Sequence, residues 1–192
     1  MSAVGIARNQ LDKIIIAPLI GFEILGNYAL TFQIYIVLFM FANVIYRYTL
    51  PQDSSGESTR KIKIIGVSYA VVISILGFTI FPLVIPLIFE EFTDVGPAIQ
   101  IMSLSVIPST ITLFYTSKFL GKEKSGVILA GTIMQCATTI IALIILAPPY
   151  GIVGATSAFV ISSVMMCVFL VSADYYKKYK QKNWKFFKNY VI

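Results

Sequence analysis

The sequence predicts an all-α fold, a polytopic bundle of about six transmembrane segments. Composition is the first observation behind this prediction, since 57% of the residues are hydrophobic, 12% are charged and the mean hydropathy is +0.83. A soluble domain carries about 25% charged residues. Because this chain has only half that share of charged residues, its polar groups are too few to cover the surface of a soluble domain. The composition excludes a cytosolic enzyme, a disordered chain and a disulfide scaffold.

Long uncharged runs are the second observation, and they place five of the six segments. The last run, residues 125–173, holds 49 residues, whereas roughly 20 suffice to cross a bilayer once. The chain must therefore fold back within it, at the turn signal Pro148-Pro149-Tyr150-Gly151. No region has the short alternation of a barrel strand, so only helices satisfy the backbone in lipid. The predicted spans lie near 24–47, 64–89, 97–117, 126–147 and 152–173.

Residues 1–22 are predicted as a sixth, partial transmembrane helix with a polar face. A signal peptide does not fit, because the charges do not precede one compact apolar stretch and no small-residue cleavage site follows. Arg8 and Asp12 are four residues apart and share a helical face with room to pair, and Lys13 is adjacent. Two interpretations stay open. The three residues face an aqueous cavity and attract an anionic head group, or they anchor the helix at the membrane surface.

The distribution of basic residues predicts the orientation. Thirteen of the fifteen Lys and Arg residues fall in 47–63, in 118–124 and in the tail, and the intervening connections hold none. The positive-inside rule makes these three regions cytoplasmic. We expect a multi-pass protein of the cell (plasma) membrane with both termini in the cytoplasm. The segment 51–61 is the only loop-like stretch, so residues 1–173 are predicted to form a single transmembrane lobe.

Residues 174–192 are predicted to form a cytoplasmic tail that lies on the membrane surface. Lysines and aromatic side chains alternate there in a pattern typical of an interfacial helix on anionic lipid. Nucleic acid is not an expected partner, because the tail supplies no folded stacking platform. The tail lysines are Lys177, Lys178, Lys180, Lys182, Lys185 and Lys188.

Several polar residues and prolines lie within the spans. Gln33, Asn43, Gln100 and Gln135 either hydrogen-bond between helices or line a substrate path. Pro82 and Pro86 place two breaks on one helical face, as a flexing point or a static bend. Glycines at 66, 77, 131, 151 and 154 allow helices to approach closely.

No nucleophile with a base, phosphate loop, carboxylate pair or metal cluster is present, so we expect no enzyme, no metal and no cofactor.

Four strings, in order, resemble the carboxy-terminal half of polysaccharide flippases of the multidrug/oligosaccharidyl-lipid/polysaccharide exporter superfamily. They are LDKIIIAPLIGFEILGNYALTFQI (11–34), the proline after a long helix at Pro51, AIQIMSLSVIPSTITLFYTSKFLGKEKSGVI (98–128) and APPYGIVGATSAFVIS (147–162). Together they cover most of residues 11–165. Each string alone is a weak match, and their order and spacing carry the resemblance.

The resemblance implies two six-helix lobes around a central cavity, alternating access and a polyprenyl-linked oligosaccharide as cargo. This chain would supply one lobe, beginning within the seventh helix of a full transporter, and a second lobe would be its partner. Arg8, Asp12 and Lys13 would then face the cavity, where the cations hold the pyrophosphate. Gln33, Asn43 and Gln135 are further cavity candidates. The alternatives are one lobe of a multidrug or cation antiporter, for which only Asp12 could bind the coupling ion, and a membrane protein that transports nothing.

Overall fold

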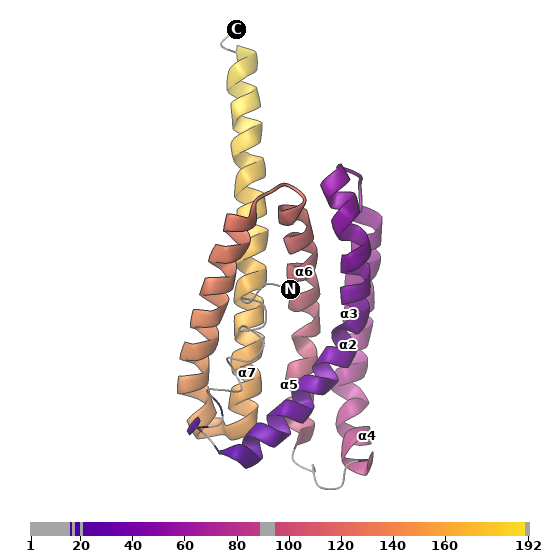
Figure 1. Cartoon of the computed structure of the whole chain (residues 1–192), viewed down its shortest axis with the longest axis vertical. Coiled ribbons are helices and arrows are strands. Elements are labelled where there is room, and N and C mark those ends of the chain that lie inside the picture. Colours follow the sequence, from indigo (N-terminus) through magenta and orange to yellow (C-terminus); the bar gives the residue numbers. More distant parts are fainter. Residues whose placement is uncertain (1–15, 17, 20, 89–94, 191–192) are drawn as a thin grey trace.

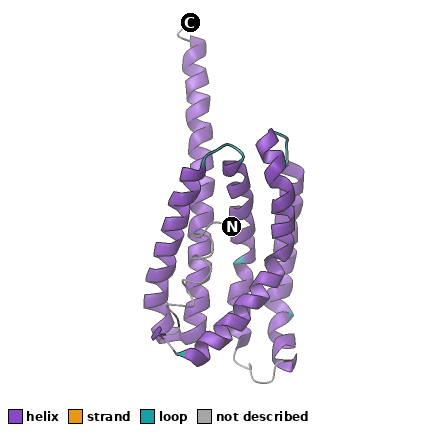
Figure 2. Ribbon diagram, viewed as in Figure 1, coloured by secondary structure: helices purple, strands orange, loops and turns teal. Residues whose placement is uncertain are grey.

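The structure is a computed structural model that describes residues 16, 18–19, 21–88 and 95–190. The described residues form helices joined by short connections, with no strand among them (Figure 2). Four of these helices are long and apolar enough to cross a membrane. Arg8, Asp12 and Lys13, and most of the predicted first segment, lie outside the described residues. The described part of the chain is thus an all-helical bundle suited to a membrane.

Helix α2 (Phe22–Ser55) is longer than its uncharged run. Its 34 residues span about 51 Å, whereas the hydrocarbon core is about 30 Å thick. The prediction of a loop over 51–61 is therefore wrong at both ends. The helix continues through Pro51 to Ser55 and is capped by Gly56, which has a φ of 83°, and the next helix begins at Arg60. An uncharged run marks the part of a helix that lies in lipid and does not mark where the helix ends.

Two of the predicted spans are interrupted helices. The span predicted over 64–89 consists of α3 (Arg60–Thr79) and α4 (Phe81–Ile88), and the break at Ile80 comes just before Pro82. The span predicted over 97–117 consists of α5 (Gly96–Leu104) and α6 (Val106–Leu120), with a break at Ser105, three residues before Pro108. Proline has no N–H to donate to the carbonyl four residues earlier, and its ring collides with that carbonyl. Each helix is therefore interrupted within the four residues that precede its proline.

Helix α7 (Ser125–Tyr190) reverses direction at Gly151, where φ is 54° and ψ is −129° (Figure 1). We call residues 125–150 its first arm and residues 152–190 its second arm. The reversal lies within the predicted Pro-Pro-Tyr-Gly turn, which confirms that the long uncharged run folds back on itself. The second arm continues as helix through the tail to Tyr190 and leaves the bundle along its own axis. The tail is thus helical but does not turn aside after the span, as a helix lying on the membrane surface would.

Small residues and a shared apolar core hold the helices together. A Cβ at Gly66 would lie 2.5 Å from the Phe114 ring of α6, so α3 and α6 approach as closely as the glycine permits. The main core gathers apolar side chains from α2, α5 and α7, including Tyr28, Met102 and Leu143, each at most 1% exposed. Outward-facing residues such as Val37 of α2 and Ile133 of α7 are large, apolar and more than 60% exposed. Such a surface is suited to lipid and not to water.

Candidate functional site

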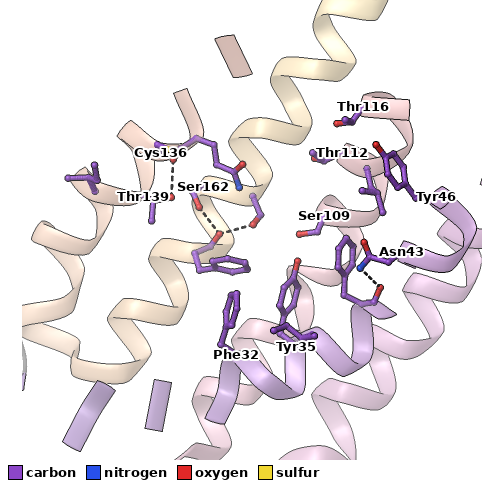
Figure 3. Close-up of a pocket in the computed structure, with 17 residues that line it drawn as sticks. Phe32, Tyr35, Asn43, Tyr46, Ser109, Thr112, Thr116, Cys136, Thr139 and Ser162 are labelled. Atoms are coloured by element: carbon purple, nitrogen blue, oxygen red, sulfur yellow. Dashed lines mark hydrogen bonds between the residues drawn. The ribbon is translucent and has the colours of Figure 1, made fainter. Parts of the chain in front are cut away.

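A cavity of about 410 Å³ lies within the bundle between α2, α6 and both arms of α7 (Figure 3). This volume falls in the range of small-molecule pockets, about 300–1,000 Å³. We call it the central cavity. It is lined by Phe32, Tyr35, Ile36, Phe39, Asn43, Tyr46, Ser109, Thr112, Leu113, Thr116, Gln135, Cys136, Thr139, Ile140, Phe159, Ser162 and Ser163.

Aromatic rings form one part of its wall. The Tyr35 and Phe39 rings on α2 stack with centroids 5.5 Å apart and planes 11° apart. Phe159 of the second α7 arm meets Tyr35 at 5.1 Å and Phe32 at 5.6 Å, in edge-to-face arrangements. These are preferred aromatic geometries, so the cluster fixes this wall and the spacing between α2 and α7.

Hydroxyl and amide groups form the rest of the wall. Asn43 Nδ2 donates to the Phe39 carbonyl (3.3 Å), and Thr139 and Ser162 donate to carbonyls of their own helix at 2.9 Å each. A hydroxyl that donates in this way still has an oxygen able to accept hydrogen bonds from a ligand. The Oε1 atom of Gln135 is buried and accepts no hydrogen bond from the described residues. Because an unsatisfied buried acceptor costs about 1–3 kcal/mol, a donor from water or a ligand would be stabilising there.

The central cavity contains some of the predicted residues and not others. Asn43 and Gln135 line it. Gln33 is exposed and does not line it, because on α2 it points away from the face that carries Phe32 and Tyr35. Arg8, Asp12 and Lys13 lie outside the described residues. None of the described lining residues is charged, so any charge that a ligand meets has to come from elsewhere.

Most of the lining hydroxyls were not identified from the sequence. Ser109, Thr112 and Thr116 of α6 recur at i, i+3 and i+7, which puts them on one helical face. That periodicity was the available signal. It is weak, since Ser and Thr also occur on helix faces where helices merely pack closely.

A second polar cluster lies at the end of the bundle where α2 meets α3 and α6 meets α7. Asp53, in the last turn of α2, forms an ion pair with Lys63 of α3. Its carboxylate also accepts hydrogen bonds from Thr59 and Ser117, both at 2.5 Å. We call these four residues the Asp53 cluster. A Cβ at Gly121 would lie 2.7 Å from the backbone of Asp53, so the α6–α7 connection packs directly on the end of α2.

A second ion pair at the same end joins α6 to the second arm of α7. Lys118 Nζ lies 2.6 Å from Asp174 Oδ1, and Asp174 is buried. The Lys118 ammonium also lies 5.6 Å from the centroid of the Tyr115 ring. Together with the Asp53 cluster, this pair connects α2, α3, α6 and α7 through charged groups at one end of the molecule.

Comparison of the chain with protein-family models, with curated proteins and with solved structures gives no match.

Proposed function

We propose that this chain is one lobe of a flippase that moves a polyprenyl-linked oligosaccharide across the plasma membrane for cell-surface polysaccharide biosynthesis. The observation that carries the proposal is the central cavity, which is uncharged among its described residues and lined by hydroxyls, amides and aromatic rings. A glycan presents hydroxyls that donate and accept hydrogen bonds, and its C–H faces pack on aromatic rings. The sequence resemblance to polysaccharide flippases adds independent support.

A lobe of a multidrug or cation antiporter is the second candidate. Binding H⁺, Na⁺ or an organic cation within a membrane calls for an acidic residue in the site. The described residues of the central cavity include none, which favours the glycan. A membrane protein that transports nothing is the third candidate, and a transport assay separates it from the other two.

The pyrophosphate of the cargo needs positive charge that the described cavity lacks. We propose that Arg8 and Lys13 supply it, with Asp12 as the counter-charge, and that a second six-helix lobe completes the cavity wall. An arginine can bind phosphate through two parallel hydrogen bonds. Arg8→Lys should therefore retain part of the transport, and Arg8→Ala together with Lys13→Ala should abolish it. Full transport by the double variant would assign these residues to the membrane surface instead.

The transport test compares cavity residues with a matched residue outside the cavity. Vesicles from the expressing cells retain any partner lobe, and a fluorescent lipid-linked oligosaccharide reports crossing by its exposure to an impermeant glycan-modifying reagent. We expect Asn43→Leu and Gln135→Leu to slow crossing at least about tenfold, since each removes hydrogen bonding to the cargo. Gln33→Leu, an equal loss of an amide on an exposed face of α2, should leave the rate unchanged. Equal effects of all three would overturn the assignment, and ion-driven ethidium transport without glycan transport would favour the antiporter.

Cys136 offers a direct test of whether the central cavity admits water and cargo. It lines the cavity, and in a Cys167→Ser background it is the only thiol in the chain. A small charged methanethiosulfonate should modify it, because only water-filled space admits a charged reagent. Lipid-linked oligosaccharide should protect it. A thiol that stays unreactive in vesicles would mean a dry bundle with no transport path.

We also propose that the end of the bundle with the Asp53 cluster is cytoplasmic, with both termini on that side. The support is the asymmetry of basic residues. In intact cells an impermeant maleimide should label Tyr150→Cys but not Ser55→Cys. The reverse pattern would invert the topology.

A further inference from the structure

A second cavity, of about 620 Å³, opens between the α2–α3 connection and the end of α6. Four cationic side chains line it, from Arg60 and Lys63 on α3, Lys118 on α6 and Lys122 in the α6–α7 connection, and two carboxylates line it as well, Asp53 and the exposed Glu57, so the cations outnumber the anions by two. We call it the basic pocket. Its basic residues come from two segments of the chain that are more than fifty residues apart, so the fold assembles a concentration of charge that neither segment holds alone.

The four cations are not equivalent. Lys63 and Lys118 are engaged in ion pairs, with Asp53 and Asp174 respectively. Arg60 and Lys122 are exposed, and neither has an ion-pair partner among the described residues. The first two are therefore held in place by their partners, and the other two are available to an anion.

The pocket also has an apolar wall. Apolar side chains line the part of the pocket that lies further along α3 and α6 from the cations. They are Ile64 and Val67 of α3 and Ile111 and Phe114 of α6. Ile64 is 55% exposed although it is large and aliphatic. The same face of α3 continues with Val71 and Ile75, which are also exposed. A cationic rim above an apolar groove matches a ligand with an anionic head and hydrocarbon chains.

We propose that the basic pocket binds the phosphate of an anionic phospholipid, with Arg60 and Lys122 on the head group and the acyl chains along α3 and α6. A free phosphate would use the cations and leave the apolar wall without a role. Basic pockets between helices at the cytoplasmic surface are suited to acidic lipid head groups. This site is separate from the central cavity, so it does not depend on the proposed transport.

The test measures lipid retained by the purified full chain. Native mass spectrometry in neutral detergent, with added phosphatidylglycerol or phosphatidylcholine, gives the affinity for each lipid. The test variant carries Arg60→Gln and Lys122→Gln. The control carries Lys61→Gln and Lys124→Gln, which remove the same charge from neighbouring positions that do not line the pocket. The tail lysines are the same in every protein, so their contribution cancels.

Each of the two cations contributes about five- to sixfold to the affinity for acidic lipid. Loss of two corresponds to roughly thirtyfold weaker binding of phosphatidylglycerol. We expect that loss in the test variant, near-unchanged binding in the control and weak binding of phosphatidylcholine throughout. Equal loss in both variants, or equal binding of the two lipids, would overturn the proposal. Displacement of the lipid by millimolar inorganic phosphate would show a site for free phosphate and would overturn the lipid assignment as well.

Discussion

The two ends of the bundle hold their helices together in different ways. At the end with the Asp53 cluster, carboxylates, ammonium groups and hydroxyls from α2, α3, α6 and α7 are paired. At the opposite end, the α7 arms meet through small residues. Ala147 and Ala155 are fully buried, and Gly154 lies so close to the Leu146 carbonyl that a Cβ would collide with it. The described residues of that second end form no ion pair.

This difference follows from where charge is tolerated. Ion pairs need water or head groups nearby to offset desolvation, so they belong at a membrane surface. Close packing of small residues works without water, because it relies on contact between backbones. The packing at one end of the molecule should therefore depend on charge and salt concentration. The packing at the other end should depend only on the volume of the side chains. The four predictions below test that division.

Gly154→Ala should be the most damaging single change. The added Cβ would collide with the Leu146 carbonyl and lie 3.1 Å from the Ala147 Cα, and these are backbone atoms that cannot rotate away. We expect a loss of at least about 4 kcal/mol in the free energy of unfolding, measured by thermal unfolding in detergent. Gly126→Ala, in the same helix with open space around the added Cβ, is the control and should be neutral or slightly stabilising. Similar changes in the free energy of unfolding for the two variants would refute the conclusion that close packing of small residues holds this end together.

Asp53→Ala should have the next largest effect. It leaves the Lys63 side chain, which is 18% exposed, without its counter-ion and removes the acceptor for Thr59 and Ser117. Removing one partner of a largely buried pair costs about 3 kcal/mol. Glu57→Ala, an exposed carboxylate in the neighbouring connection, should change stability by less than about 0.5 kcal/mol. If the two variants unfold at the same temperature, the Asp53 cluster does not hold this end.

Asp174→Asn should be milder and should depend on salt. Its partner Lys118 is 28% exposed, so water already compensates part of the interaction. We expect a loss of about 1–2 kcal/mol at low salt and a smaller difference from the native chain in 1 M salt, where charges are screened over about 3 Å. Unfolding curves at two salt concentrations measure this. A difference that grows with salt would contradict the electrostatic origin.

Glu123→Gly should be slightly stabilising. Glu123 has a φ of 54° in the turn between α6 and α7, a conformation that suits glycine. The relief of strain is partly offset by the greater freedom of glycine in the unfolded chain, which leaves a gain of about 0.5 kcal/mol. At Lys122 φ is negative, so Lys122→Gly relieves no strain. It only increases the conformational freedom of the unfolded chain and should be destabilising. Chemical denaturation of the two variants should therefore shift in opposite directions.

Those features of the fold that depend on hydrophobicity were predictable from the sequence. The uncharged runs located the membrane-facing parts of α2, α3, α6 and α7, and the Pro-Pro-Tyr-Gly signal located the reversal at Gly151. The C-terminal end of α2 was not predictable, because the segment after Pro51 is polar and has the composition of a loop. Its helical continuation depends on Asp53 finding partners in α3 and α6, which is a tertiary contact.

The candidate site was predictable only in part, for a related reason. Asn43 and Gln135 stand out in apolar helices, and both line the central cavity. Gln33 stands out equally and is exposed, since a single polar residue does not reveal which face of its helix is covered. The aromatic wall depends on Phe159 meeting Tyr35 from a different helix. No local pattern contains that information.

The reversal of α7 also bears on how the chain is inserted during synthesis. Residues 125–173, including the turn, carry no charge. Moving this turn through the hydrocarbon therefore avoids the 2.5–3.5 kcal/mol, roughly, that insertion scales assign to an ionised side chain at the centre of a helix. The two arms already touch at Leu146 and Gly154, so they can enter the bilayer together as a helical hairpin. With the orientation proposed above, the Lys and Arg residues on either side would stay on the cytoplasmic side, and both arms would cross the membrane in a single step.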